Sequence, residues 1–142
     1  MKKILVLHGP NLNLLGTREP EIYGKTTLEE INRQIEKNAG SMGVEVKVYQ
    51  TNREGELIDL LHKHRDWMEG IIINPAAYSH TSLAVYDALM AVNRPAVEVH
   101  LTNLAKRGHV RSRSVTAAAC VGIISGFGPA SYMLALQYLA AL

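Results

Sequence analysis

The chain has 142 residues, of which 47% are hydrophobic and 20% charged, and its net charge is +2. This composition excludes a disordered or fibrous protein, and so small a charge does not indicate nucleic-acid or membrane binding. The length predicts a single domain over residues 1–142, and a single cysteine, Cys120, excludes an internal disulfide framework. The apolar runs are too short to span a bilayer, and the residues after Met1 lack the apolar stretch of a secretory signal. We therefore expect a cytoplasmic protein.

Strand and helix patterns alternate along the first half of the chain. The apolar run 4–7 predicts a strand that is buried on both faces. A capping box formed by Thr27 and Glu30 predicts a helix from there to about residue 42, ended by Gly43, and residues 44–49 alternate as a strand. A second helix is expected over 54–68 and a third strand over 71–73.

The second half continues the alternation. We expect a helix over 81–92, a strand over 96–99, a basic loop over 102–114, a buried strand over 120–125 and a C-terminal helix opened by Pro129. Five strands alternating with helices predict an α/β fold, a parallel sheet with helices on both faces and the flavodoxin-like strand order 2-1-3-4-5. Ligands of such sheets bind beyond the carboxyl ends of the strands. That rule predicts a site built from 8–24, 51–52, 74–82, 98–103 and 126–128.

Several common chemistries lack their motifs. Gly24-Lys25-Thr26 resembles the end of a phosphate-binding P-loop, but position 19 is Glu where that loop needs Gly. The sequence contains no G-x-G-x-x-G after the first strand, no H-E-x-x-H and no G-x-S-x-G. His62 and His64 lie two apart on a predicted helix and face different ways, which argues against a metal pair. We interpret Cys120 as an inert core thiol, so acid–base chemistry remains.

Two pairs of residues suit acid–base chemistry. Glu98 and His100 lie two apart at the end of a strand and so emerge on the same face. A carboxylate beside an imidazole fixes the tautomer and favours the protonated ring, as a general acid requires; a polar pair at a strand edge is the alternative. Arg18 and Tyr23 lie in the long segment 8–24, and a nearby guanidinium favours the phenolate that would make a tyrosine a base. The alternative is a half-buried loop aromatic beside a solvated arginine.

A basic stretch at 106–113 carries four Lys and Arg side chains in eight residues. It is compatible with nucleic acid, with an anionic metabolite or with no ligand. Because it follows the strand of His100 at the ligand end of the sheet, a small carboxylate substrate is the more economical interpretation.

Six segments carry a resemblance to a known family. "GPNLNLLGTREPEIYG", "EGELIDLLH", "IIINPAAYSHTS", "DAL", "EVHLTN" and "GFG" occur in an order and at a spacing that resemble the type II 3-dehydroquinate dehydratases, over essentially the whole chain. The resemblance implies a flavodoxin-like fold and a hydro-lyase that converts 3-dehydroquinate to 3-dehydroshikimate in chorismate and aromatic amino-acid biosynthesis. It also implies an anti elimination through an enolate, with no metal and no cofactor.

The resemblance further implies roles for five catalytic residues. Tyr23 would remove the C2 proton, and Arg18 would keep its phenolate available. Asn11, with the carbonyl of the preceding proline, would hold a water against the enolate oxygen. His100, oriented by Glu98, would protonate the departing C1 hydroxyl. The segment 16–25 would then be a lid that carries Arg18 and Tyr23 over the substrate.

The remaining implied residues bind substrate or connect subunits. Those implied to hold the substrate are Asn74, His80, Leu101, Thr102 and Arg111, with Leu101 and Thr102 acting through their backbone. Asp87 would reach the site of a neighbouring subunit, in a dodecamer made of four trimers. The match is loosest over 104–115, and His8, Ala76 and Thr102 stand where many relatives carry Asn, Gly and Ser.

The alternative class is a non-catalytic flavodoxin-like binding module. A receiver needs acidic residues at the end of the first strand, where this sequence has His8-Gly9. A flavin carrier needs a Ser/Thr-rich phosphate loop at the same place. Neither pattern is present, so we expect an enzyme.

Overall fold

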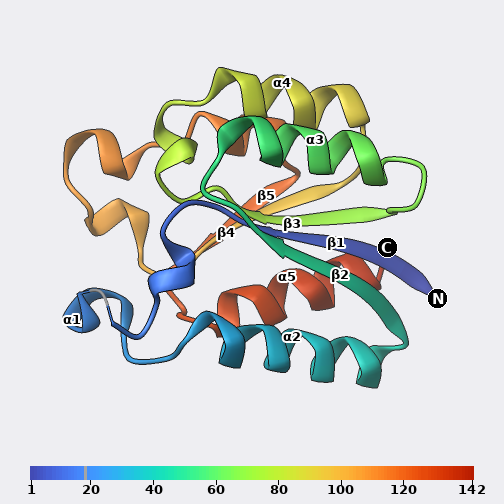
Figure 1. Cartoon of the computed structure of the whole chain (residues 1–142), viewed down its shortest axis with the longest axis horizontal. Coiled ribbons are helices and arrows are strands. Elements are labelled where there is room, and N and C mark those ends of the chain that lie inside the picture. The colour runs from blue at the N-terminus through green and yellow to red at the C-terminus, as the bar shows by residue number, and fades with distance from the viewer. Residues whose placement is uncertain (18) are drawn as a thin grey trace.

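The computed structural model describes residues 1–17 and 19–142. One parallel sheet runs in the order β2-β1-β3-β4-β5, which confirms the predicted topology. Its strands are β1 (Lys2–His8), β2 (Val44–Gln50), β3 (Gly70–Asn74), β4 (Ala96–His100) and β5 (Gly122–Ser125). Helices α2 (Leu28–Met42) and α5 (Ala130–Ala140) cover one face, and α3 (Glu54–His64) and α4 (Leu83–Val92) cover the other (Figure 1).

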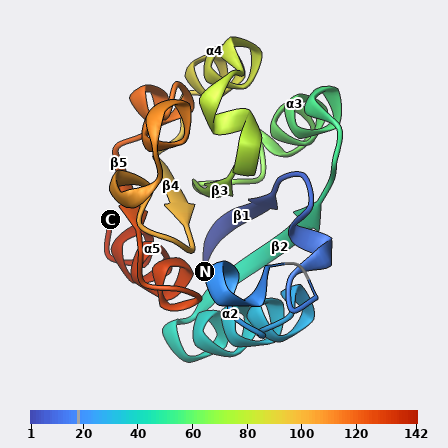
Figure 2. The same ribbon diagram turned by 90° about the vertical axis from the view of Figure 1, so that its left-hand side faces the viewer.

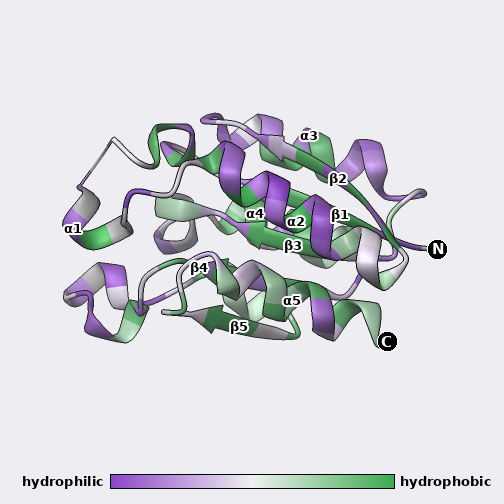
Figure 3. Ribbon diagram, turned by 90° about the horizontal axis from the view of Figure 1, so that it is seen from below, coloured by the Kyte–Doolittle hydropathy of each residue, from purple (hydrophilic) through white to green (hydrophobic). Residues whose placement is uncertain are grey.

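The apolar core is divided between the two faces of the sheet. Ile4 and Val6 of β1 pack in the cluster that includes residues of α2 and α5, whereas Leu5 and Leu7 pack with residues of α3 and α4. Alternate side chains of one strand therefore enter opposite layers, as the unbroken apolar run predicts. Seen from the side of α2 and α5, hydrophilic residues gather on the outer turns of α2, and the strands behind are mostly hydrophobic (Figure 3).

The ends of α2 follow the predicted signals. The Thr27 hydroxyl accepts a hydrogen bond from the Glu30 backbone N–H at 3.2 Å, which satisfies one of the unpaired donors of the first turn. Gly43 ends the helix with a φ of 68°, a left-handed conformation in which its N–H bonds to the Ala39 carbonyl.

Helix α3 is shorter than predicted. It ends at His64 and not at 68, because the chain tightens there into turns in which Trp67 and Met68 both donate to the His64 carbonyl. The Arg94 guanidinium satisfies two carbonyls beyond the helix end, those of Arg65 at 2.8 Å and Met68 at 3.1 Å. An arginine that is distant in the sequence thus satisfies carbonyls just after this helix end, and the local periodicity does not reveal it.

The last strand also differs from its prediction. β5 begins at Gly122 and not at 120, and Val121 (58% exposed) and Ile123 (45% exposed) contradict the expected buried strand. The reason is that β5 is an edge strand with one neighbour, β4. Cys120 lies before it and is partly buried, and this burial raises the pKa of the thiol to about 12, in keeping with an inert group.

Short helical turns occupy the segments that were predicted to be irregular. The segment after β1 contains a 3₁₀ helix at Leu12–Leu14 and a short α-helix, α1 (Pro20–Tyr23). The basic loop contains 3₁₀ helices at Leu104–Lys106 and His109–Ser112, and another at Ala76–His80 precedes α4. No helix within the described ranges is long and apolar enough to cross a membrane.

Candidate active site

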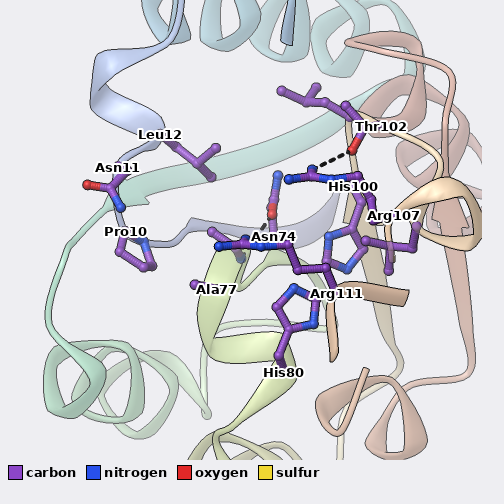
Figure 4. Close-up of a pocket in the computed structure, with 13 residues that line it drawn as sticks. Pro10, Asn11, Leu12, Asn74, Ala77, His80, His100, Thr102, Arg107 and Arg111 are labelled. Carbon is purple, nitrogen blue, oxygen red and sulfur yellow. Dashed lines mark hydrogen bonds between the residues drawn. The ribbon is translucent and has the colours of Figure 1, made fainter. Parts of the chain in front are cut away.

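A cavity of about 140 Å³ opens where β1, β3 and β4 end. Figure 2 looks onto these carboxyl ends, and the place between β1 and β3 is where the strand order reverses, the position at which such folds bind ligands. The lining residues are Pro10, Asn11, Leu12, Asn74, Ala76, Ala77, His80, His100, Leu101, Thr102, Leu104, Arg107 and Arg111 (Figure 4). A space of this size suits a small metabolite rather than a nucleotide.

The loops after β1 and β3 are packed directly on each other at the floor of the cavity. The Gly9 N–H donates to the Asn74 carbonyl at 2.7 Å, and a Cβ at Gly9 would lie 2.5 Å from the Pro75 carbonyl oxygen. Only glycine fits this approach. Asn11 follows in a left-handed conformation (φ 69°) with its N–H bonded to Asn52 Oδ1 at 3.0 Å. The first loop is therefore fixed where it enters the site.

Glu98 and His100 form a buried acid–base pair at the end of β4. His100 Nε2 lies 2.7 Å from Glu98 Oε2, and Glu98 is fully buried. Because a carboxylate only accepts, the proton of this hydrogen bond belongs to Nε2. His100 Nδ1 is then the ring nitrogen left to exchange a proton with a ligand in the cavity. The prediction that the two side chains share a face is confirmed.

Two hydroxyls that the sequence analysis missed complete the surroundings of Glu98. Ser114 Oγ donates to Glu98 Oε2 at 2.6 Å, and Thr116 Oγ1 donates to Oε1. With His100, three donors converge on one buried carboxyl group, so both of its oxygens have hydrogen-bond partners. Ser114 and Thr116 lie 16 and 18 residues after Glu98, and no motif in the sequence links them to it.

His80, another residue of the cavity lining, is held in a defined tautomer. Its Nδ1 lies 2.7 Å from the backbone carbonyl of Arg113, so Nδ1 carries the hydrogen. Nε2 of the neutral ring is therefore an acceptor, suited to a ligand hydroxyl. Figure 4 shows His80 and His100 among the side chains that line the cavity.

The cavity is basic. His80, His100, Arg107 and Arg111 line it, and among the described residues no carboxylate does. Arg107 Nη1 donates to the Thr102 hydroxyl at 3.2 Å, which fixes the guanidinium at the rim. The sequence marks the basic stretch, but no pattern in it places Arg107 in the site. This lining favours an anionic ligand.

The structure brings together most of the residues expected in the site. Those that line the cavity are Asn11, Asn74, His80, His100, Leu101, Thr102 and Arg111, with Glu98 directly behind His100. Asp87 is exposed on α4 and does not line it. Arg18 lies outside the described residues, and the side chain of Tyr23 is likewise outside the description. Figure 1 places α1, which ends at Tyr23, at the same end of the sheet as the cavity.

Fold and site together define a class of protein: a flavodoxin-like enzyme whose buried Glu–His pair faces a small basic cavity, suited to proton transfer on an anionic metabolite.

Comparison with known proteins gives the family. The family described as Dehydroquinase class II matches residues 2–140. A 3-dehydroquinate dehydratase of Carboxydothermus hydrogenoformans is 61% identical over 134 residues, covering 94% of this chain and 87% of that protein. The crystal structure of a type II dehydroquinase from Propionibacterium acnes superposes with a TM-score of 0.96 at 42% identity and covers 100% of this chain and 98% of that one. The chain belongs to the class II dehydroquinase family, and it is therefore an enzyme of the hydro-lyase type.

Proposed function

We propose that this chain removes water from 3-dehydroquinate to give 3-dehydroshikimate, in chorismate and aromatic amino-acid biosynthesis in the cytoplasm. Residues 1–142 would act as one catalytic domain. The observation that carries the proposal is the buried Glu98–His100 pair at the edge of a basic cavity. The substrate bears a carboxylate, which the basic lining favours, and a C1 hydroxyl that must be protonated as it leaves.

His100 is the proposed general acid. When the ring is doubly protonated, the Glu98 carboxylate stabilises the cation through Nε2, and Nδ1 donates to the departing hydroxyl. Three donors hold the Glu98 side chain in place, so it orients the ring. General acids of this kind contribute roughly 10²- to 10⁴-fold in rate.

Tyr23 is the proposed base, with Arg18 as its activator. A free tyrosine has a pKa of about 10, and a guanidinium in a site closed to water favours the phenolate by Coulomb attraction. Abstraction of the C2 proton beside the ketone then gives an enolate, and loss of the C1 hydroxyl on the opposite face completes an anti elimination. The segment 16–25 is proposed to close over the substrate as a lid.

Residues that line the cavity are proposed to bind the substrate. Asn74, His80 and Arg111, which line the cavity, are proposed to bind its hydroxyls, and the backbone of Leu101 and Thr102 is proposed to bind its carboxylate. Asn11 is proposed to hold a water against the enolate oxygen, as an oxyanion site does.

We also propose that the chain assembles into trimers and that four trimers form a dodecamer. Large apolar side chains exposed on α4 and around β5 are the surfaces that such an assembly would bury. They are Leu83 (67% exposed), Met90 (54%), Val121 (58%), Ile123 (45%) and Phe127 (65%). Asp87 lies on the exposed side of the same helix as Leu83 and Met90, in keeping with a role in the site of a neighbouring subunit.

The direct test is an absorbance assay. Purified protein mixed with 3-dehydroquinate should produce the ultraviolet absorbance of the conjugated enone. Borohydride added with substrate should leave the activity intact, because no step forms an imine with a lysine. Absence of the enone would overturn the proposed reaction, and a stable mass adduct on a lysine would overturn the enolate route.

A further inference from the structure

A chain of four buried or part-buried polar groups leads from the cavity into the apolar layer between the sheet and α2 and α5. Asn74 Nδ2 lies 3.0 Å from the Tyr132 hydroxyl, which lies 3.0 Å from His8 Nδ1. His8 Nε2 lies 2.8 Å from Asn32 Oδ1. The four residues come from β3, α5, β1 and α2, so the chain connects the floor of the site to both helices of that layer.

One backbone hydrogen bond fixes the direction of the whole chain. The Ala76 N–H donates to Asn74 Oδ1 at 3.1 Å, so the amide nitrogen Nδ2 is the atom that faces Tyr132. Nδ2 donates, so the Tyr132 oxygen accepts and its own proton goes to His8 Nδ1. His8 must then be neutral, with its hydrogen on Nε2 directed at Asn32. One hydrogen of Asn74 Nδ2 remains as a donor for a ligand.

Burial stabilises this arrangement. His8 and Tyr132 are fully buried, and Asn74 is nearly so. Desolvation lowers the pKa of His8 to about 4 and raises the pKa of Tyr132 well above its usual value. Both groups therefore stay neutral at physiological pH. The Tyr132 hydroxyl then accepts a hydrogen bond from Asn74 Nδ2 and donates one to His8 Nδ1.

We infer that Tyr132 and His8 are positioning residues that hold the Asn74 carboxamide in the orientation in which it donates to the substrate. The inference rests on the proposed function of Asn74 as a substrate-binding group. It assigns a role in substrate binding to His8, which does not line the cavity, and to α5, a helix that covers one face of the sheet. A polar chain this well buried also contributes to stability, so the test must separate positioning from folding.

The central variant is Tyr132→Phe, which removes only the hydroxyl. The matched control is Tyr138→Phe on the same helix, where the side chain is 47% exposed. We expect Tyr132→Phe to raise KM for 3-dehydroquinate by about tenfold with kcat changed much less, because a binding group is misplaced and the acid and base are not. Tyr138→Phe should match the wild type. A Tyr132→Phe enzyme with a lowered melting temperature but wild-type KM would show a structural role only and overturn the inference.

A double-mutant cycle tests whether Tyr132 acts through Asn74. In an Asn74→Ala background, Tyr132→Phe should add less than about twofold to KM, because the group it positions is gone. Equal effects in both backgrounds would overturn the inference. If Asn74→Ala alone leaves KM unchanged, the binding role of Asn74 fails, whereas absence of wild-type turnover refutes the proposed reaction.

Two substitutions at His8 give an independent test if Tyr132→Phe does not fold. The Oδ1 of Asn takes roughly the place of His Nδ1, whereas the polar end of Gln takes roughly the place of Nε2. His8→Asn therefore keeps the acceptor for the Tyr132 proton, and His8→Gln keeps only the contact with Asn32. We expect His8→Asn to stay within about threefold of wild-type KM and His8→Gln to resemble Tyr132→Phe. The reverse order would contradict the inference.

Discussion

The substitution Glu98→Gln probes the acid half of the proposed reaction while nearly preserving shape. Glu98 accepts from His100, Ser114 and Thr116, and an amide has only one oxygen to replace two. In Glu98→Gln the amide nitrogen can point toward the hydroxyl of Ser114 or Thr116, because either hydroxyl can rotate to accept a hydrogen bond instead of donating one. The oxygen can then still accept from His100, so the ring keeps its place and tautomer. What is lost is the negative charge opposite the ring.

The magnitude follows from the difference between charged and neutral hydrogen bonds. A bond to a charged group contributes about 1.5–3 kcal/mol and a neutral one about 0.5–1.5 kcal/mol, so the loss is roughly 1–2 kcal/mol in the state that contains the imidazolium. At about 1.4 kcal/mol per factor of ten, kcat should fall roughly 5- to 30-fold. Removal of the ring in His100→Ala should cost more, roughly 10²-fold or greater.

The assay is enone formation at saturating 3-dehydroquinate, with Glu45→Gln, an exposed change on β2, as the control. We expect the order wild type and control, then Glu98→Gln, then His100→Ala. Wild-type kcat in Glu98→Gln would refute the charge argument. A loss larger than that of His100→Ala would show that Glu98 acts other than through the ring.

Tyr23→Phe should lower kcat by several orders of magnitude while substrate still binds in a calorimeter, and near-normal turnover would remove Tyr23 as the base. His8 has a pKa of about 4 in the folded protein against 6.5 when unfolded, so the unfolded chain binds more protons between these values and stability falls as pH decreases through that window. Between pH 7 and 4 the wild type should therefore lose about 3 kcal/mol more unfolding free energy than His8→Asn in urea titrations; parallel losses would contradict this. Asp87→Arg should reduce the sedimentation coefficient, the turnover or both, and a wild-type chain that sediments as a fully active monomer would end the assembly proposal.

The parts of the fold that the sequence predicted are those fixed by local signals. The buried strands β1 and β3 were predicted from their apolar runs, and the ends of α2 from Thr27 and Gly43. Each of these signals acts within a few residues, and each prediction is confirmed. The carbonyl of Arg65, just after α3, is bound instead by Arg94, 29 residues further along the chain. The exposure of β5 depends on its place at the sheet edge, which no local pattern encodes.

The site divides in the same way. Glu98 and His100 are predictable because a two-residue spacing on a strand forces a shared face. Ser114 and Thr116 lie 16 and 18 residues after Glu98 and contact it only in the folded chain, so the sequence does not reveal their part in the site. The contact between His8 and Tyr132 spans 124 residues and likewise needs the packed structure.

The stereochemistry of the proposed elimination can be read from the fate of deuterium placed stereospecifically at C2 of 3-dehydroquinate. The proposed base and acid act on opposite faces, so deuterium anti to the C1 hydroxyl should pass to solvent and the 3-dehydroshikimate should have the mass of the unlabelled product. Deuterium on the same side as the hydroxyl should remain in the product. Retention of the anti label with loss of the syn label, read by mass spectrometry, would contradict the elimination proposed for this site.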